Sequence, residues 1–215
     1  MNYKGILFDL DGVLIKSVEQ HLEAWQHAFS HYTTIEAREF YLLEGRGVKS
    51  VVEALTDKYG IDSGLRQKIM EDKVEYYNSI FKPEFYDNIF SLLDRLKEKN
   101  VRMAVVTGAM RDRVNDLVRE YLDGYFSAIV SSDDVKKTKP YPEPYLKGAS
   151  LLGLRPEECI VVENAPMGIK AAKSAGTFVI AITTTLRRED LEEADYITES
   201  FSEMKKYLDE QVFSV

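Results

Sequence analysis

The stretch GILFDLDGVL, residues 5–14, starts with a continuous apolar run that Asp9 interrupts. Such a run is typical of a strand covered on both faces of a parallel sheet, so we expect the strand to end at Asp9. Asp9 and Asp11 then point to the same side beyond the carboxyl end of the strand, where open α/β sheets bind their ligands. Two carboxylates this close need a cation beside them or a shared proton. A strand followed by a plain Asp-Gly turn at Gly12 is the alternative interpretation.

Length and charge restrict the classes of protein to consider. The chain has 215 residues, enough for one sizeable core or for a core with a small second module. Its 28 basic and 36 acidic residues give a net charge of −8, which argues against nucleic acid or an anionic membrane as the main partner. No apolar run approaches the roughly 18 residues of a membrane span, and the start of the chain does not have the pattern of a signal peptide. We therefore predict a cytoplasmic protein.

The single cysteine is not expected to react. Cys159 lies inside the apolar run CIVV, so we predict a buried thiol that is neither a nucleophile nor half of a disulfide. His27 and His31 share a helix face but have no third ligand and no acidic partner in the pattern, so we expect them at the surface.

The pattern of apolar residues changes once along the chain. From Ser17 to Phe81 every periodic segment has the spacing of a helix, whereas after Pro83 strands and helices alternate. Alternation of this kind predicts an α/β fold of parallel strands with crossover helices. The expected strands after Pro83 are 101–106, 127–132, 159–164 and 178–183, with a short one at 195–198, and the expected helices are 88–99, 111–122, 142–152, 166–174 and 200–211. The apolar faces expected before Pro83 are Val18, Leu22, Trp25 and Phe29; Val48, Val51, Val52, Leu55 and Tyr59; and Leu65, Ile69, Tyr76 and Ile80.

The first strand is separated from the others by a helical segment of about 65 residues, far longer than an ordinary connection between a strand and a helix. We therefore predict a core formed by residues 1–15 and 84–215, with residues 16–83 inserted as a separate helical unit.

A hydroxyl and a glycine follow the strand at 101–106. Thr107 and Gly108 precede a helix whose amino end presents free backbone N–H groups, which together make a good receptor for a phosphate oxygen. A threonine that merely starts the loop is the alternative.

Lys139 lies in the segment KKTKPYPEPY, in which Pro140, Pro142 and Pro144 restrict the backbone. The stiff segment is expected to hold the lysine in place, whereas a solvated lysine run before a helix is the alternative.

Glu163 and Asn164 end the apolar run CIVV. A carboxylate that ends a buried strand needs a cation close by. Asn164 can instead cap the helix that begins at Pro166.

The order of these motifs resembles the haloacid dehalogenase-like superfamily of phosphatases and phosphomutases over essentially the whole chain. Its four motifs correspond here to Asp9-Leu10-Asp11-Gly12, Thr107, Lys139-Pro140 and Glu163-Asn164. The most similar branch contains β-phosphoglucomutase and small sugar-phosphate phosphatases. That branch implies a Rossmann-like doubly wound parallel sheet with a helical cap inserted after the first strand. His21, Trp25, the loop GRGVKS, Lys73 and Tyr77 are similar to features of its cap.

The resemblance implies a role for each motif residue. Asp9 would take the phosphoryl group as an aspartyl phosphate, and Asp11, with a raised pKa, would protonate the leaving oxygen and later deprotonate water or a sugar hydroxyl. Thr107 and Lys139 would hold the charge of the transferring group. Mg²⁺ would be bound by Asp9, the backbone carbonyl of Asp11, and the pair Glu163 and Asn164.

Substrate contacts are expected from the loop after Thr107 and from the cap. Gly108 belongs to the expected phosphate receptor. The resemblance implies that His21 and Lys73 bind the substrate. Arg46 and Lys49 lie between glycines and a helix start, where a closed cap would bring them toward a dianionic substrate.

Three positions depart from the family pattern. Asn164 stands where the family usually has Asp, Lys16 occupies a hinge position that is often acidic, and Met110 stands where the mutase has a lysine beside its phosphate site. These departures weaken the mutase assignment more than the phosphatase one. We therefore predict an Mg²⁺-dependent phosphatase acting on a small phosphorylated metabolite, most simply a sugar phosphate, with a β-phosphoglucomutase-like phosphomutase as the alternative. A receiver-like phospho-signalling module is the alternative from another class. We expect a monomer, with a dimer as the alternative.

Overall fold

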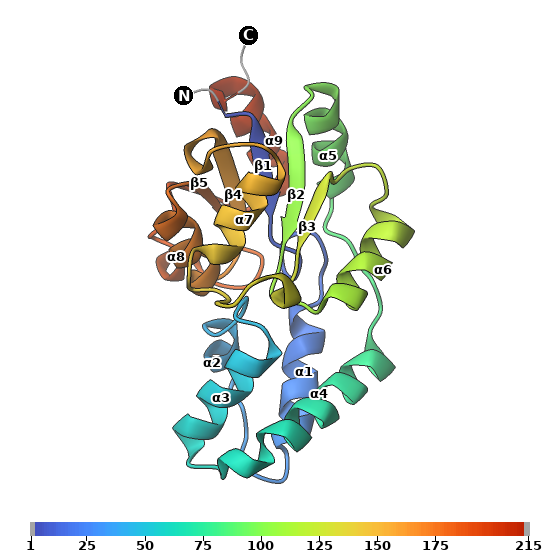
Figure 1. The fold of residues 1–215 in the computed structure, drawn as a ribbon, viewed down its shortest axis with the longest axis vertical. Helices are drawn as coiled ribbons and strands as arrows, with labels where there is room; N and C mark the ends of the chain where they lie inside the picture. The colour runs from blue at the N-terminus through green and yellow to red at the C-terminus, as the bar shows by residue number, and fades with distance from the viewer. Residues whose placement is uncertain (1–2, 213–215) are drawn as a thin grey trace.

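A computed structural model of the chain describes residues 3–212. In this part of the chain six strands form one parallel sheet in the order β3-β2-β1-β4-β5-β6 (Figure 1). This is the strand order of a doubly wound Rossmann-like fold, so the predicted fold class is confirmed. It differs from the 2-1-3-4-5 order of receiver-like folds, which removes the signalling module as an alternative. The strands are β1 Gly5–Phe8, β2 Arg102–Val106, β3 Ala128–Val130, β4 Cys159–Glu163, β5 Phe178–Ile182 and β6 Tyr196–Thr198.

In the described part of the chain, five helices cover the two faces of the sheet. Because side chains alternate along a strand, Ile6 and Phe8 of β1 face one side and Leu7 faces the other, and all three are fully buried. This burial on both faces is what the continuous apolar run of β1 predicts. Cys159 is buried, as predicted. The helices are α5 Ile89–Glu98, α6 Arg111–Tyr121 and α9 Phe201–Tyr207 on the Ile6 side, and α7 Glu143–Leu151 and α8 Pro166–Ala175 on the Leu7 side.

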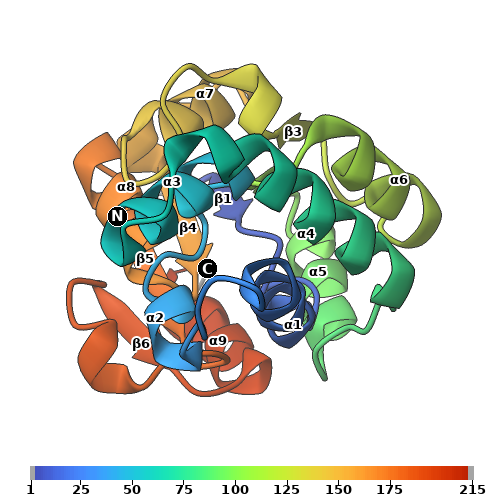
Figure 2. The same cartoon turned by 90° about the horizontal axis from the view of Figure 1, so that it is seen from below.

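Four further helices form a second lobe, which Figure 1 shows below the sheet and Figure 2 shows lying in front of it. They are α1 Val18–Phe29, α2 Ala37–Tyr41, α3 Val48–Tyr59 and α4 Arg66–Ile80. They have an apolar core of their own, which includes Trp25, Phe29, Val52 and Leu55. The apolar spacing predicted this lobe as helical, but it did not predict the short helix α2.

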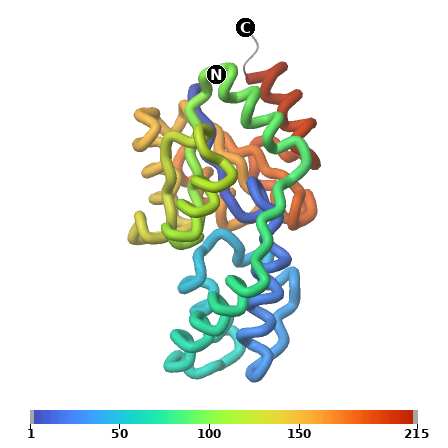
Figure 3. The backbone as a smooth tube through the Cα atoms, turned by 90° about the vertical axis from the view of Figure 1, so that its right-hand side faces the viewer, coloured from blue at the N-terminus to red at the C-terminus, as the bar shows by residue number. Residues whose placement is uncertain are grey.

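The chain passes between the two lobes in two segments, which Figure 3 shows in blue after β1 and in green before α5. Lys16 and Glu84 join these segments by a backbone hydrogen bond of 2.7 Å and an ion pair of 2.6 Å. The side-chain amide of Gln20 hydrogen-bonds both the carbonyl and the N–H of Lys82. The two crossing segments therefore form one paired connection.

One predicted helix face differs from the structure. The apolar spacing placed Tyr76 and Ile80 on the inner face of α4, but the buried residues are Ile69, Lys73 and Tyr77. These are spaced four residues apart and therefore share a face. Lys73 turns inward because a polar partner is available there, which apolar spacing alone does not reveal. His27 and His31 are exposed, as predicted. No helix within residues 3–212 is long and apolar enough to cross a bilayer.

Candidate active site

The ends of neighbouring strands bring the motif residues together. Asp9 follows β1 and Thr107 follows β2, and each continues the ladder by one backbone hydrogen bond, to the carbonyls of Val162 and Val130 respectively. Glu163 is the last residue of β4, the other neighbour of β1. Since the strands are parallel, these side chains meet at one edge of the sheet, where the strand order reverses between β1 and β4.

Lys139 lies at the centre of this group and is only 1% exposed. Its ammonium donates to Asp9 Oδ1 at 2.5 Å, to Glu163 Oε1 at 2.6 Å and to the carbonyl of Val106 at 3.2 Å. These three bonds use all of its donors. Burial works against the charged form of Lys139, but the two carboxylates outweigh burial and raise its pKa. Burial also raises the pKa of Asp9, although the Lys139 ammonium opposes that shift.

Four donors hold the carboxylate of Glu163. Its Oε1 accepts from Lys139 and from the hydroxyl of Tyr145 at 2.6 Å, and its Oε2 accepts from the N–H groups of Asn164 and Ala165 at 3.0 and 3.3 Å. A carboxylate has about four lone-pair sites, so these bonds fill them. The structure therefore does not leave Glu163 free for the metal-ligand role that the sequence suggested, and Glu163 instead holds Lys139 in position.

The carboxylate of Asp11 is bound by Arg113, a residue that the sequence did not single out. Arg113 lies on α6 and donates Nη1 to Oδ2 at 3.0 Å and Nη2 to Oδ1 at 2.6 Å. Ser17 also donates to Oδ1 at 2.5 Å. Burial alone would raise the pKa of Asp11, but the charge of Arg113 and the hydrogen bonds from Arg113 and His21 outweigh burial and lower this pKa well below its usual range. This contradicts the raised pKa that the sequence predicted, because the prediction did not include Arg113.

His21 and Lys73 extend this network into the helical lobe. His21 Nε2 lies 3.2 Å from Asp11 Oδ1, and Lys73 Nζ lies 2.9 Å from His21 Nδ1. Burial lowers the pKa of His21 to about 3, and it lowers the pKa of Lys73 to about 7. Because lysine only donates, Nδ1 of His21 is the acceptor and Nε2 carries the hydrogen that faces Asp11. The ring of His21 stacks on Tyr77 at 4.1 Å.

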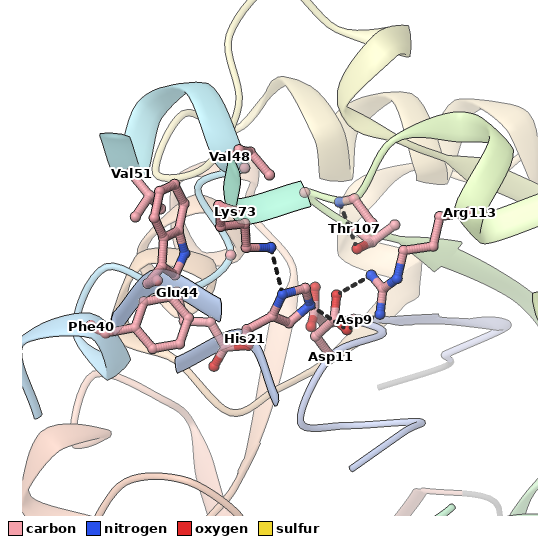
Figure 4. Close-up of a pocket in the computed structure, with 15 residues that line it drawn as sticks. Asp9, Asp11, His21, Phe40, Glu44, Val48, Val51, Lys73, Thr107 and Arg113 are labelled. Carbon is pink, nitrogen blue, oxygen red and sulfur yellow. Dashed lines mark hydrogen bonds and ion pairs between the residues drawn. The ribbon is translucent and has the colours of Figure 1, made fainter. Parts of the chain in front are cut away.

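These residues surround one small cavity of about 60 Å³. Asp9, Asp11, His21, Lys73 and Thr107 line it, together with Glu44 and Arg113 (Figure 4). The volume is that of about two water molecules, which suits a phosphoryl group and little more. The structure therefore brings together residues that follow β1 and β2 and residues of α1, α4 and α6, around a space lined by charged side chains and by apolar ones such as Trp25 and Phe40.

Gly108 allows the two lobes to approach closely beside this cavity. A Cβ atom on Gly108 would lie 2.7 Å from the carbonyl oxygen of Gly45 and 2.8 Å from the backbone nitrogen of Gly47. Thr107 Oγ1 accepts a hydrogen bond of 3.1 Å from the N–H of Ala109, which fixes the turn that Gly108 occupies. Gly108 lines the cavity, as the expected phosphate receptor requires.

The profile of the haloacid dehalogenase-like hydrolase family matches residues 6–182 of the chain. The chain belongs to the haloacid dehalogenase-like hydrolases. The family that the sequence motifs resembled is therefore confirmed, and with it the prediction of a hydrolase.

Known members of this hydrolase family resemble the chain over nearly its full length. The validoxylamine A 7'-phosphate phosphatase of Streptomyces hygroscopicus subsp. limoneus is 33% identical, over 94% of this chain and 96% of that protein. The pyrophosphatase PpaX of Anoxybacillus flavithermus is 31% identical, over 97% of this chain and 98% of that protein. Among solved structures, a putative β-phosphoglucomutase from Bacteroides vulgatus has a TM-score of 0.86 and 32% identity, over 97% of this chain and 88% of that chain.

Arg46 and Lys49 do not line the small cavity of this hydrolase. They line an adjoining cavity of about 980 Å³ that meets the first one at Gly47, Val48 and Gly108. Arg46 Nε donates to Ser50 Oγ at 3.0 Å, which holds it along helix α3. A substrate longer than its phosphoryl group would have to reach this adjoining cavity to contact either residue.

Glu44 and Asn164 offer oxygen atoms to a cation. Asn164 Nδ2 donates to Glu44 Oε2 at 3.1 Å and to Thr185 Oγ1 at 3.0 Å, which leaves Asn164 Oδ1 and Glu44 Oε1 buried without a hydrogen-bond partner. Burial raises the pKa of Glu44 well above its usual range, and the charges of Asp9 and Asp11 add to this shift. Buried amide and carboxylate oxygens are donors that suit Mg²⁺, so the residues fit this ion.

Ionisable side chains alone do not form a metal site in the described part of the chain. Within residues 3–212 no group of three or more His, Cys, Asp or Glu side chains is arranged to hold a metal ion. A cation bound here would therefore also need the amide oxygen of Asn164 or main-chain oxygens. Glu44 had no motif signal in the sequence, since one acidic residue before a glycine is ordinary in a loop.

Gly168 of α8 controls the position of Glu163. A Cβ atom on Gly168 would lie 1.7 Å from Glu163 Oε1 and 2.0 Å from its Cδ. The glycine therefore lets helix α8 pass against the carboxylate that holds Lys139.

We expect Gly168→Ala to lower turnover of p-nitrophenyl phosphate about a hundredfold, because the methyl group displaces Glu163 and with it Lys139. Overpacking should also lower the free energy of unfolding by about 1–3 kcal/mol. Lys170→Ala, on the exposed side of the same helix, is the control. Turnover in Gly168→Ala equal to that of Lys170→Ala would show that the position of Glu163 is not needed.

Proposed function

We propose that this hydrolase is an Mg²⁺-dependent phosphatase that removes the phosphoryl group from a small phosphorylated metabolite, most simply a sugar phosphate. One observation carries the proposal: the buried carboxylate of Asp9, held by Lys139, faces a phosphoryl-sized cavity at the carboxyl end of β1. The relative that is 33% identical is named a phosphatase of a phosphorylated compound, which supports the same reaction class.

The proposed reaction has two steps at Asp9. Asp11 is a carboxylate while Arg113 binds it, so it takes up a proton from water when it turns from Arg113 toward the leaving oxygen. An oxygen of Asp9 attacks phosphorus, the bond from phosphorus to the leaving oxygen breaks, and that oxygen takes this proton from Asp11. Water then gives a proton to the Asp11 carboxylate and attacks phosphorus, which breaks the bond to Asp9 and releases inorganic phosphate. The free Asp9 carboxylate and the protonated Asp11 are restored.

Other residues stabilise or place the reacting groups. Lys139 holds Asp9 in line with the cavity and offsets its charge, and Thr107 and Gly108 shape the wall that receives the phosphoryl oxygens. His21 and Lys73 present a hydrogen-bonded pair to the same cavity, and we propose that they bind the substrate there. The small cavity itself has room for only a few water molecules beside the reacting groups.

Mg²⁺ would be held by Asp9, the main-chain carbonyl of Asp11, Asn164 and Glu44. Glu44 replaces Glu163 in the set that the sequence suggested, because Glu44 has a free buried oxygen and Glu163 does not. When bound, the ion would neutralise charge on the transferring phosphoryl group.

We propose that residues 16–83 act as a cap over a core of residues 1–15 and 84–215. The contacts of His21 with Asp11 and of Glu44 with Asn164, across the two parts, support this division. Arg46 and Lys49 would then contact the part of the substrate that extends into the adjoining cavity. The cytoplasmic location and the monomeric state, with a dimer as its alternative, stay predictions.

A phosphomutase is the second candidate, because the Bacteroides vulgatus structure named a putative β-phosphoglucomutase is so similar in fold. A mutase has to bind a second phosphate at the far end of the sugar. At the position where the mutase pattern has a lysine, this chain has Met110, which is 46% exposed. Lys16 lies at the hinge, where its ammonium is paired with Glu84. We therefore favour hydrolysis over transfer to a sugar hydroxyl.

We expect Asp9→Asn to reduce turnover of p-nitrophenyl phosphate by roughly three orders of magnitude or more, because an amide cannot form the aspartyl phosphate. Excess EDTA should abolish turnover by the unaltered protein, and added Mg²⁺ should restore it. Full activity of a clean Asp9→Asn preparation, or of the protein in EDTA, would rule out the proposed mechanism.

Glu44→Gln should raise the Mg²⁺ concentration needed for half-maximal activity by about tenfold or more, because it removes a charged ligand. Calorimetric titration with Mg²⁺ alone should show the same weakening without substrate. Glu36→Gln, at the exposed start of α2, is the matched control. Equal Mg²⁺ affinities for Glu44→Gln and the unaltered protein would remove Glu44 from the metal site.

A further inference from the structure

Arg113 lies where the small cavity beside Asp9 meets a third cavity of about 590 Å³. The two cavities share the side chains of His21, Lys73 and Arg113, so the route from Asp9 into the larger space passes two cationic residues. A substrate whose phosphoryl group is at Asp9 and whose remainder takes this route places that remainder beside the guanidinium.

The guanidinium already holds an anion in a two-pronged hydrogen bond. Nη1 and Nη2 of Arg113 donate to the two oxygens of Asp11 at 3.0 and 2.6 Å. This planar fork matches a carboxylate or a phosphate equally well. Nη2 also donates to the hydroxyl of Tyr77 at 2.7 Å, and Nε is buried without a partner. Among residues 3–212, Asp11 is the only residue that forms an ion pair with Arg113.

This arrangement conflicts with the proposed reaction unless something replaces Asp11. Asp11 has to reach the leaving oxygen and then the attacking water, but both of its oxygens are engaged by Arg113. If Asp11 leaves, the guanidinium of Arg113 loses its counter-charge. The side chain of Arg113 is only 17% exposed, and an unpaired charge is unfavourable in such a largely buried position. An anionic group on the substrate can take the place of the Asp11 carboxylate in the same fork.

We infer that Arg113 selects substrates that carry a second anionic group, a carboxylate or a phosphate, close to the phosphoryl group that is transferred. This inference rests on the proposed phosphatase function and adds a substrate class to it. The substrate anion binds the guanidinium, and Asp11 is released to act on the leaving oxygen. A neutral substrate leaves Asp11 bound to Arg113 and reacts slowly.

The second anion has to be near the phosphoryl group, not at the far end of a long molecule. The third cavity is also lined by four exposed carboxylates, those of Asp112, Asp116, Glu120 and Asp133. These carboxylates repel an anion that extends beyond Arg113. The cavity therefore favours a short, doubly anionic substrate.

Two matched compounds test this selectivity directly. The first, 2-phosphoglycolate, carries a carboxylate two bonds from the ester oxygen, whereas 2-hydroxyethyl phosphate has a neutral hydroxymethyl group in its place. We expect the unaltered protein to have a kcat/KM at least about tenfold higher for 2-phosphoglycolate, the effect of one charge-assisted hydrogen-bonded pair. The longer 4-phosphooxybutanoate should show no such advantage, and pyrophosphate should behave like 2-phosphoglycolate.

Substitution of Arg113 assigns the preference to this residue. Arg113→Ala should remove the difference between the two matched compounds, and Arg113→Lys should keep only part of it, because an ammonium cannot form the fork. The control is Arg111→Ala. Arg111 lies on the same helix as Arg113, but its guanidinium pairs with Asp134, so this variant should keep the full preference. If Arg113→Ala does not fold, Arg113→Gln provides the same comparison.

The outcomes separate this inference from the proposed function. Hydrolysis of p-nitrophenyl phosphate without preference between the matched compounds, or a preference that survives in Arg113→Ala and Arg113→Gln, overturns the inference and leaves the phosphatase function standing. Release of phosphate from none of the compounds, p-nitrophenyl phosphate included, overturns both. A preference that disappears only when Arg113 is replaced supports the assignment.

Discussion

The Lys139 ammonium, shared between the carboxylates of Asp9 and Glu163, is the interaction on which the rest of the site depends. Three ionisable groups that are almost fully buried tolerate burial only because each hydrogen bond is made. The parallel sheet supplies the two carboxylates, since β1 and β4 are neighbours and end at the same edge. Tyr145 and the start of α8 complete the bonding of Glu163. The fold therefore places Asp9 in one orientation before any substrate binds.

The helical lobe contributes polar groups where apolar contact would be the usual expectation. Glu44 and His21 bond Asn164 and Asp11 at the sheet edge, and Lys73 bonds His21 behind them. Glu44 and Lys73 are among the most buried charged residues of the chain. Burying such groups is unfavourable unless they are paired, so their presence indicates a function of the lobe contact beyond holding the lobes together. The proposed binding of an anionic substrate and of Mg²⁺ at this contact would account for both signs of charge.

The sequence pattern by itself predicts the residues that end strands and fails for residues that meet only through packing, of which His21 and Lys73 were expected only through the family resemblance. Asp9, Thr107 and Glu163 could be placed together because parallel strands end at one edge, whatever the details of packing. Lys139 could be included because prolines restrict its segment. Arg113 could not, because an arginine on an amphipathic helix has the same pattern whether it faces solvent or Asp11. The pKa of Asp11 was predicted in the wrong direction for that reason.

Acid-quenched mass spectrometry tests the central claim most directly, because it asks whether the phosphoryl group is ever bonded to Asp9. The protein is mixed with a saturating phosphorylated substrate and Mg²⁺, quenched in acid during turnover, digested, and its peptides are examined for one added phosphoryl group. The account predicts that this group is found on the peptide containing Asp9 and is absent after the reaction has gone to completion. Sustained phosphate release with no phosphoryl group on that peptide, or with the group on another residue, would contradict it.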